Sequence, residues 1–391
     1  MADRREPAIA WAEPGSARPS PWRVMVVYAL AVLALGCHRS PGKLGEPPPP
    51  GRRFHRIDVH THISPDGVER AVRLMNEWGI DGMVNLSGMH PGPPHNALQT
   101  QLAAAAQSGG RIAVFTTPDF KLVRRVQNYG AAMADQLTEA HRLGAIGLKI
   151  TKGLGLGYTD AQRKLVAIDD KGLDPLFETA GRLKMPITIH SGDPKAFWLP
   201  PTRANERWDE LVVHPRWSFY GFPVSWQDLF DQFERRVARH PKTIFIGAHF
   251  GNDPEDPDNV ARMLDKHKNL YIDTAARVPE IGRVDARHDA GRMRAFFERY
   301  QDRILFGTDT GVGENPEDLM LGSTGATPPG PADVERFFDS TWRWFETGEK
   351  NIPTPTPIQG RWNVDGIALP QPILEKVYHA NAERVIGVKL P

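Results

Sequence analysis

Cysteine is nearly absent from this sequence, since its 391 residues include only Cys37. One cysteine excludes an intrachain disulfide framework and a zinc cluster held by thiolates. An excess of one charge sign is lacking too, because 48 Lys and Arg residues stand against 47 Asp and Glu residues, for a net charge of +1. This balance gives no reason to expect a nucleic acid partner. We expect a small-molecule substrate instead.

A long apolar run is also lacking, because the run at residues 24–36 is too short to span a bilayer comfortably. Its length suits the core of a signal peptide. The run follows Arg18 and Arg23 and ends at Cys37 in ALGC, which resembles a bacterial lipobox whose cysteine is lipidated. We therefore expect residues 1–37 to direct export and to anchor the protein to a bacterial membrane, facing the periplasm or exterior. A signal peptide cut elsewhere and a short membrane anchor are the alternatives.

The next segment, residues 38–55, is rich in Pro, Gly and Arg and has no hydrophobic periodicity. Such a composition is typical of a stiff, exposed spacer. We therefore place one folded domain at residues 56–391. No short-period repeat is visible in it, which argues against a solenoid.

Eight short apolar runs recur along this domain, each ending in polar or Gly-rich residues. They are continuous rather than alternating, as expected of strands buried on both faces. Stretches long enough for helices separate them, and one of these shows clear helical spacing of its apolar residues. Eight strand–helix repeats predict an α/β fold, the (β/α)8 TIM barrel. The runs begin near residues 56, 79, 111, 145, 186, 243, 269 and 303, and helices are predicted at 67–78, 128–144, 173–184 and 225–241.

Two segments exceed what a minimal barrel needs. Residues 194–226 follow the fifth predicted strand and residues 311–372 follow the eighth. Both leave from the C-terminal ends of strands, where barrel enzymes hold their active sites. We therefore expect two long insertions on the active rim.

Histidines and other polar residues stand at the ends of several predicted strands. His60 and His62 lie two residues apart, so they share one face of the first strand. A lone histidine is most often an ordinary core or loop residue, but the strand ends of a barrel converge on one rim. Imidazoles with a carboxylate suit zinc and other borderline divalent metals. The residues that converge are His60, His62, Lys149, His190, His249 and Asp309.

With these residues the chain resembles the amidohydrolase superfamily. Within it the chain is similar to the amidohydrolase-related branch, which includes metal-dependent hydrolases and decarboxylases of the aminocarboxymuconate-semialdehyde decarboxylase type. The resemblance covers about residues 56–390, nearly all of the predicted domain. Each motif alone is weak, and together they are specific. They are DVHTH in the first strand, ITIHSGD in the fifth, IGAHFG in the sixth, FGTD in the eighth and the closing YHANAERVIG.

The resemblance implies that His60, His62, His190 and Asp309 hold one divalent metal, with zinc the expected ion. Water bound to such a metal becomes acidic near neutral pH and supplies a nucleophile. Asp309 would accept the proton and return it to the leaving group. His249 would stabilise oxyanion charge or orient the water.

Two further residues have alternative roles. In two-metal relatives a carbamylated lysine at the position of Lys149 bridges the ions, and His190 and His249 bind the second one. In a one-metal site, which we expect here, Lys149 would instead contact an acidic substrate. Asp58, two residues before His60, would orient a metal ligand by accepting a hydrogen bond, or would cap the strand end.

The first insertion is the best guide to the substrate, because it holds eight aromatic residues. Most of them are expected to pack the insertion against the barrel. Arg203, Arg207 and Arg216 lie among them. Aromatic faces with arginine suit a ring or a sugar that carries a carboxylate. The candidates for substrate contact are Arg203, Trp198 and Trp217.

These patterns favour a metal-dependent hydrolase that cleaves a C–N or C–O bond of amide or lactone type. Non-oxidative decarboxylation is the first alternative, because the same ligands serve both reactions. A catalytically silent binding lipoprotein is the second; its expected signature, a missing ligand, is not found among the motifs.

Overall fold

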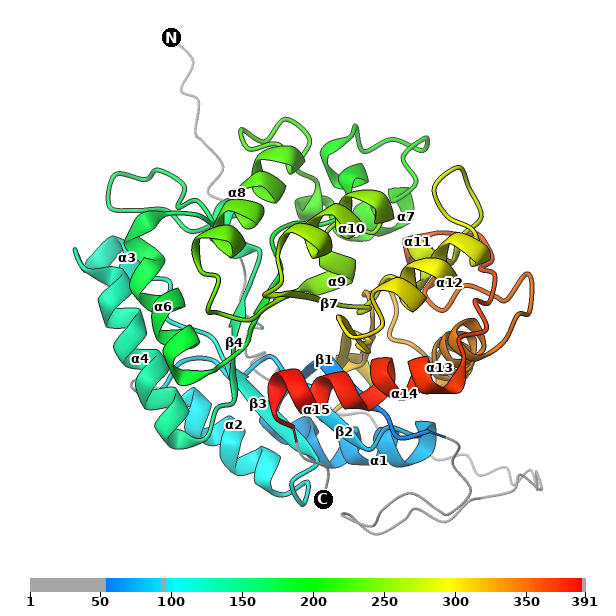
Figure 1. Ribbon diagram of the computed structural model, residues 1–391, viewed down its shortest axis with the longest axis horizontal. Coiled ribbons are helices and arrows are strands. Elements are labelled where there is room, and N and C mark those ends of the chain that lie inside the picture. Colours follow the sequence, from blue (N-terminus) through cyan, green and yellow to red (C-terminus); the bar gives the residue numbers. More distant parts are fainter. Residues whose placement is uncertain (1–53, 93–95, 389–391) are drawn as a thin grey trace, which may run out of the picture. The chain divides into compact units, whose positions relative to one another are not determined.

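The computed structural model describes residues 54–92 and 96–388 (Figure 1). Cys37, the predicted signal peptide and most of the predicted spacer lie outside these residues. Phe54 is buried and packs against Tyr378, with ring centroids 5.8 Å apart, so the packed domain begins slightly before the boundary at residue 56. In the described part of the chain, no helix combines the length and apolar character needed to cross a membrane.

Eight parallel strands form the barrel that the sequence predicts. From β1 to β8 each strand pairs in parallel with the next one along the chain. Helices connect the strands and pack around the outside of the sheet (Figure 1). The strands are β1 (Ile57–Ile63), β2 (Gly82–Asn85), β3 (Ile112–Thr116), β4 (Gly147–Ile150), β5 (Ile187–Ile189), β6 (Phe245–Gly247), β7 (Leu270–Asp273) and β8 (Ile304–Leu305).

The barrel closes between its first and last strands. β8 is interrupted and continues as β9 (Thr310–Val312), which pairs in parallel with β1. Within the interruption, the Val59 N–H donates to the Phe306 carbonyl at 2.9 Å, and the Asp309 N–H donates to the His60 carbonyl at 2.8 Å. Backbone pairing therefore holds Asp309 beside His60.

The four helices predicted from spacing are confirmed to within a residue or two. In α8 a capping box between Ser225 and Asp228 starts the helix, and the predicted apolar face is buried. A short strand, β10, adds an antiparallel edge to β9. The elements are α1 (Val68–Trp78), α2 (Ala97–Ala106), α3 (Leu122–Arg125), α4 (Tyr129–Leu143), α5 (Gly153–Leu156), α6 (Asp174–Leu183), α7 (Trp208–Val213), α8 (Trp226–Arg239), α9 (Ala248–Gly251), α10 (Pro257–Lys266), α11 (Val278–Gly282), α12 (Ala290–Arg299), β10 (Met320–Leu321), α13 (Pro331–Glu346), α14 (Gln371–Glu375) and α15 (Asn381–Ile386).

Two apolar cores hold the barrel together. The larger lies between the sheet and the helices, and the smaller includes Val59, Phe115 and Ile246 from three strands. Val385 and Ile386 of α15 join this smaller core. The helix α15 thus packs against apolar side chains of several strands.

The two insertions contact each other over the rim. Glu210 of the first accepts a hydrogen bond from Ser323 of the second. His214 Nε2 lies 2.8 Å from the Thr324 carbonyl, so that this ring nitrogen donates. The first insertion also packs internally, since Trp198 stacks on Phe219 with centroids 4.6 Å apart. Most of its aromatics thus serve packing, as the sequence indicated.

Candidate metal centre

His60 is fixed in the barrel by a carboxylate from another strand. Its Nδ1 lies 2.8 Å from Oδ2 of Asp273, at the end of β7, and both side chains are buried. A carboxylate beside one imidazole nitrogen fixes the tautomer, so Nδ1 donates and Nε2 keeps its lone pair. Burial raises the pKa of Asp273 to about 6, although nearby Lys149 opposes the rise. His60 therefore presents one nitrogen as a ligand.

His62 and Asp309 complete a group of donors with His60. Asp309 Oδ1 lies 3.4 Å from His62 Nε2 and 3.6 Å from His60 Nε2. One ligand atom from each of the three residues lies within 4.8 Å of the others. On the far side of its ring, His62 Nδ1 lies 2.8 Å from the Ser87 hydroxyl. These spacings and this mixed nitrogen and oxygen donor set fit a divalent ion such as zinc.

Asp309 reaches this group through an uncommon backbone conformation. Its φ is +62°, in the left-handed region that only a few per cent of non-glycine residues adopt. Burial alone would raise the pKa of Asp309, but His62, His60 and Lys149 together lower it below its ordinary value. The carboxylate therefore stays ionised, the form that binds a cation.

His249 packs against the ring of His60, with centroids 4.8 Å apart, and has left-handed backbone as well, with φ of +54°. Its N–H donates to Asp273 Oδ1 at 2.8 Å, and its ring Nδ1 lies 3.0 Å from the Ala275 carbonyl. A carbonyl can only accept, so Nδ1 carries the proton and Nε2 is an acceptor. Burial lowers the pKa of His249 well below its ordinary value. His60, His249 and Asp273 form a second group of possible ligands.

His190 belongs to neither group, although it lies close to both. Its ring meets the ring of His249 with centroids 4.3 Å apart. Its Nε2 lies 3.4 Å from Asp193 Oδ1, and Lys152 Nζ donates to the other oxygen of Asp193 at 2.6 Å. Burial would raise the pKa of Asp193, but Lys152 and His190 hold it well below its usual range. Three of the four ligands expected from the sequence, His60, His62 and Asp309, thus lie together, and His190 lies outside their group.

Lys149 lies directly against the donor group. Its Nζ is 3.1 Å from His60 Nε2, and its side chain is buried. Burial lowers the pKa of Lys149 to about 8. A lysine with a lowered pKa is more often neutral than an exposed one, and the neutral amine is the form that reacts or accepts a hydrogen bond. The neutral amine is the form that carbamylation requires, and the ammonium is the form that would attract an acidic substrate.

Asp58 does not contact a ring of the predicted ligands. It accepts hydrogen bonds from the backbone N–H of His60 at 3.1 Å and from the N–H and hydroxyl of Thr308 at 3.0 and 2.5 Å. The register between β1 and β2 shifts between Asp58 and Thr61, which interrupts the regular alternation of faces. Asp58 thus ties β1 to the loop before Asp309, and the carboxylate that orients His60 is Asp273.

The predicted substrate contacts divide between two places. Trp198 approaches Gly192, two residues after His190, and its Nε1 donates to the Val224 carbonyl at 2.9 Å. Trp217 has the Lys152 ammonium 5.3 Å from its ring centroid. Arg203 instead lines an outer groove together with Trp208. Trp198 and Trp217 therefore contact the segments that follow β5 and β4, whereas Arg203 lines a separate groove.

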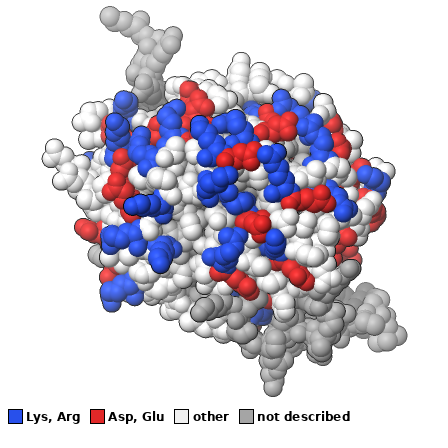
Figure 2. Space-filling model, in the orientation of Figure 1, with Lys and Arg blue, Asp and Glu red and all other residues white. Residues whose placement is uncertain are grey.

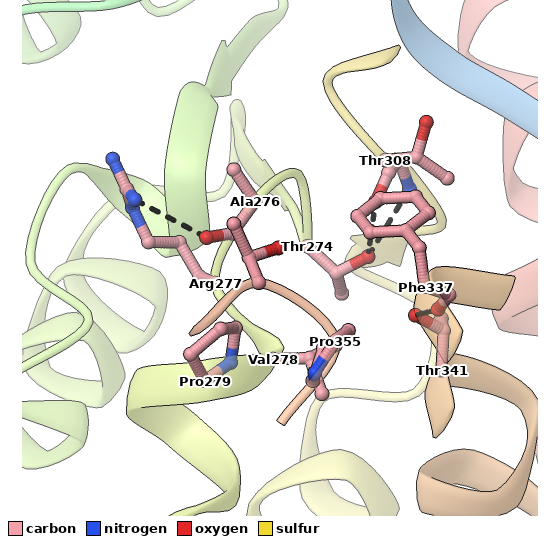
Figure 3. A pocket seen from close by; sticks show the side chains of 11 residues that line it. Thr274, Ala276, Arg277, Val278, Pro279, Thr308, Phe337, Thr341 and Pro355 are labelled. Carbon is pink, nitrogen blue, oxygen red and sulfur yellow. Dashed lines mark hydrogen bonds between the residues drawn. The ribbon is translucent and has the colours of Figure 1, made fainter. Parts of the chain in front are cut away.

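A small cavity lies between the ends of β7 and β8 and the helix α13 (Figure 3). It is lined by Thr274, Gly307 and Thr308 among others, and Arg277 extends away from the other lining side chains. With a volume of about 10 Å³ it has room for one water molecule. This cavity is too small for the predicted substrate.

Charged side chains of both signs are interspersed on the face shown in Figure 2. The pattern agrees with the balanced net charge of +1.

The chain belongs to the amidohydrolase family. The sequence profile described as amidohydrolase matches residues 57–388, which is nearly the whole described domain. This family includes metal-binding enzymes of the barrel fold, in agreement with the resemblance drawn from the motifs. A comparison with curated proteins finds no match.

Solved structures to which this chain is similar include three of named activity. 2,6-Dihydroxybenzoate decarboxylase from Rhizobium is 15% identical, with a TM-score of 0.48 over 85% of this chain and 99% of that one. Dihydroorotase from Campylobacter jejuni is 12% identical, with a TM-score of 0.46 over 86% and 84%. A probable 2-pyrone-4,6-dicarboxylic acid hydrolase from Acinetobacter baumannii is 12% identical, with a TM-score of 0.42 over 85% and 99%. Likenesses this distant say nothing about the reaction of this chain.

Proposed function

We propose that the protein is a metal-dependent hydrolase that cleaves a C–N or C–O bond, of amide or lactone type, in a small carboxylated ring or sugar-like substrate. The observation that carries the proposal is the convergence of His60, His62 and Asp309, with ligand atoms within 4.8 Å of one another at the C-terminal strand ends. One divalent ion, expected to be zinc, would act there as a Lewis acid and make a nearby water acidic. His190 is the fourth proposed ligand.

The side chains around this group supply the proton transfers that hydrolysis needs. Asp309 is an ionised carboxylate at the mouth of the donor group and can take a proton from water and return it to the leaving atom. His249 presents Nε2 as an acceptor, because its Nδ1 donates to the Ala275 carbonyl. Asp273 contacts the ring of His60 and the backbone N–H of His249, so one carboxylate orients the first ring and fixes the backbone position of the second residue.

The tautomer of His249 supports hydrolysis over non-oxidative decarboxylation. Hydrolysis begins with removal of a proton from water, which requires an acceptor beside the reacting atoms. Decarboxylation on the same scaffold ends with delivery of a proton to carbon, which requires a donor. An acceptor fixed at this place suits the first reaction better.

Lys149 and the two tryptophans have proposed roles in binding. In a one-metal site the ammonium of Lys149 would attract a substrate carboxylate, and Trp198 and Trp217 would bound the substrate on the side of the first insertion. We also propose that Cys37 carries a lipid that tethers the domain to a bacterial membrane.

An assay of the zinc-loaded protein tests the proposed reaction. A panel of lactones, amides and aromatic carboxylic acids is followed by proton release and by CO2 release. Hydrolysis predicts proton release from a lactone, or a free amine from an amide, without CO2, because an amine set free near neutral pH takes up the proton of the new acid. CO2 release from an aromatic acid would establish the decarboxylase instead, and metal binding without turnover of the panel would favour a binding protein.

A further inference from the structure

Asp193 and Lys152 form a polar connection between His190 and the first insertion. Asp193 is buried, and its two oxygens face different partners. One lies 3.4 Å from His190 Nε2, and the other accepts from Lys152 Nζ at 2.6 Å. The same ammonium lies 5.3 Å from the ring centroid of Trp217, in the insertion. Four residues from three separate segments thus make one continuous chain of contacts.

The contact with Asp193 decides which nitrogen of His190 can bind a metal. His190 Nε2 is buried and makes no hydrogen bond of normal length within the described residues. Asp193 Oδ1, at 3.4 Å, is the carboxylate oxygen that faces this nitrogen. A carboxylate only accepts, so Nε2 would carry the proton and Nδ1 would keep the lone pair.

The relation between Asp273 and His60 provides a precedent within the same site. There a carboxylate from another strand end engages one imidazole nitrogen and leaves the other as a ligand. Such partners fix the ring orientation and raise the basicity of the ligand nitrogen. Asp193 faces His190 in a similar way, although it belongs to the same segment and lies 3.4 Å from Nε2, and Lys152 donates to its other oxygen.

We propose that Asp193 is a positioning residue that orients His190 toward the metal, and that Lys152 fixes Asp193 and thereby links the ligand to the aromatic insertion. The inference rests on the proposed metal centre and adds two residues to it. Neither residue touches the reacting atoms in this arrangement. Their effect passes through the imidazole of His190.

The chain offers a matched control in the same region. Lys195 Nζ donates to Asp253 at 2.6 Å, the same distance as in the first pair, and lies 4.1 Å from the ring centroid of Trp226. Asp253 is buried, like Asp193. The second pair therefore has the same elements as the first, a lysine, a buried aspartate and a tryptophan ring. Its carboxylate, however, accepts a hydrogen bond from Asn259 and does not face a predicted metal ligand.

The experiment measures the affinity of the full chain for Zn²⁺ by competition with a chelator, and the visible absorption spectrum of the Co²⁺ form. Asp193→Asn should weaken Zn²⁺ binding by roughly 10–100-fold, the usual effect of removing such a partner. It should also change the Co²⁺ spectrum, which reports the geometry of the ligands. Lys152→Met should change both in the same direction and by less. Lys195→Met and Asp253→Asn should leave both as in the wild type.

Wild-type affinity and an unchanged Co²⁺ spectrum in Asp193→Asn and Lys152→Met would overturn the inference, as would equal weakening in Lys195→Met. If Asp193→Asn fails to fold, Lys152→Met decides the question alone. Failure of the wild-type protein to bind Zn²⁺ or Co²⁺ at all would instead overturn the proposed function. The two failures are therefore distinguishable.

Discussion

The imidazole of His60 and the carboxylate of Asp273 lie 2.8 Å apart in the buried interior of the barrel. The two residues are 213 positions apart in the sequence. Asp273 uses its other oxygen to hold the backbone N–H of His249 at 2.8 Å. One carboxylate therefore sets the orientation of one proposed ligand and the position of one proposed catalytic histidine. Both effects depend on a buried charge that the surrounding groups stabilise.

Replacement of Asp273 by Asn should weaken metal binding by roughly 10–100-fold, because the amide can no longer fix His60 with a charged acceptor. Zn²⁺ affinity measured by chelator competition checks this. Asp253→Asn is the control, since Asp253 is buried but contacts Lys195 and Asn259. Equal affinity in Asp273→Asn and wild type would show that the contact is dispensable.

His190→Ala should remove metal and activity together, because the variant loses one of the four proposed ligands. Metal content after dialysis and turnover of the best substrate are the two measurements. Full metal occupancy in the variant would remove His190 from the proposed ligand set and leave His60, His62 and Asp309 as its protein members.

His249→Ala should keep the metal and lose roughly 10²–10⁴-fold in turnover, the usual scale of help from a general acid or base. The reason is that His249 lies outside the group of His60, His62 and Asp309 that would hold the single ion. Lys149→Ala serves as a second probe. A fall from two ions to one in either variant would contradict the one-metal site and favour a carbamylated Lys149 as a bridge.

Phe115→Ala should destabilise the domain by about 3–5 kcal/mol, the range for removing a buried aromatic ring. Phe115 is fully buried in the smaller core, and a Cβ added at Gly147 would come within 2.3 Å of its ring. Urea denaturation of the wild type and of each variant gives the free energy of unfolding. Val126→Ala is the comparison, since Val126 is 38% exposed. An equal loss of unfolding free energy in both variants would contradict the burial of Phe115 in the smaller core.

Cys37→Ser should release the protein from the membrane fraction or leave it unprocessed, because the lipid would be attached at that thiol. Fractionation of cells and the mass of the mature N-terminus check this. The same membrane partition and the same N-terminus in both proteins would show that Cys37 is not the anchor.

The sequence predicted the barrel because strand-like runs and helices alternate with a period that few other folds produce. It located His60, His62 and Asp309 because each stands at the end of a predicted strand and matches a known motif. Asp273 and Asp193 were missed, although each stands at or just after a predicted strand. Their significance comes from distances to histidines on other strands, which a single sequence does not contain.

Asp58 shows a second limit of prediction from periodicity. Its place two residues before His60 suggested a shared face, but that rule assumes a regular strand. The register shift between Asp58 and Thr61 breaks the assumption. The left-handed backbone of Asp309 and His249 was equally invisible, because neither residue is a glycine that would have indicated it.

The metal content of the purified domain tests the central claim most directly. The wild-type protein, purified without added metal and then dialysed against Zn²⁺ and back into metal-free buffer, is analysed by elemental mass spectrometry beside the double variant His60→Ala/His62→Ala. The account predicts about one tightly held divalent ion per wild-type chain and almost none in the folded double variant. A folded wild-type protein without bound metal, or a double variant that retains a full equivalent, would contradict it.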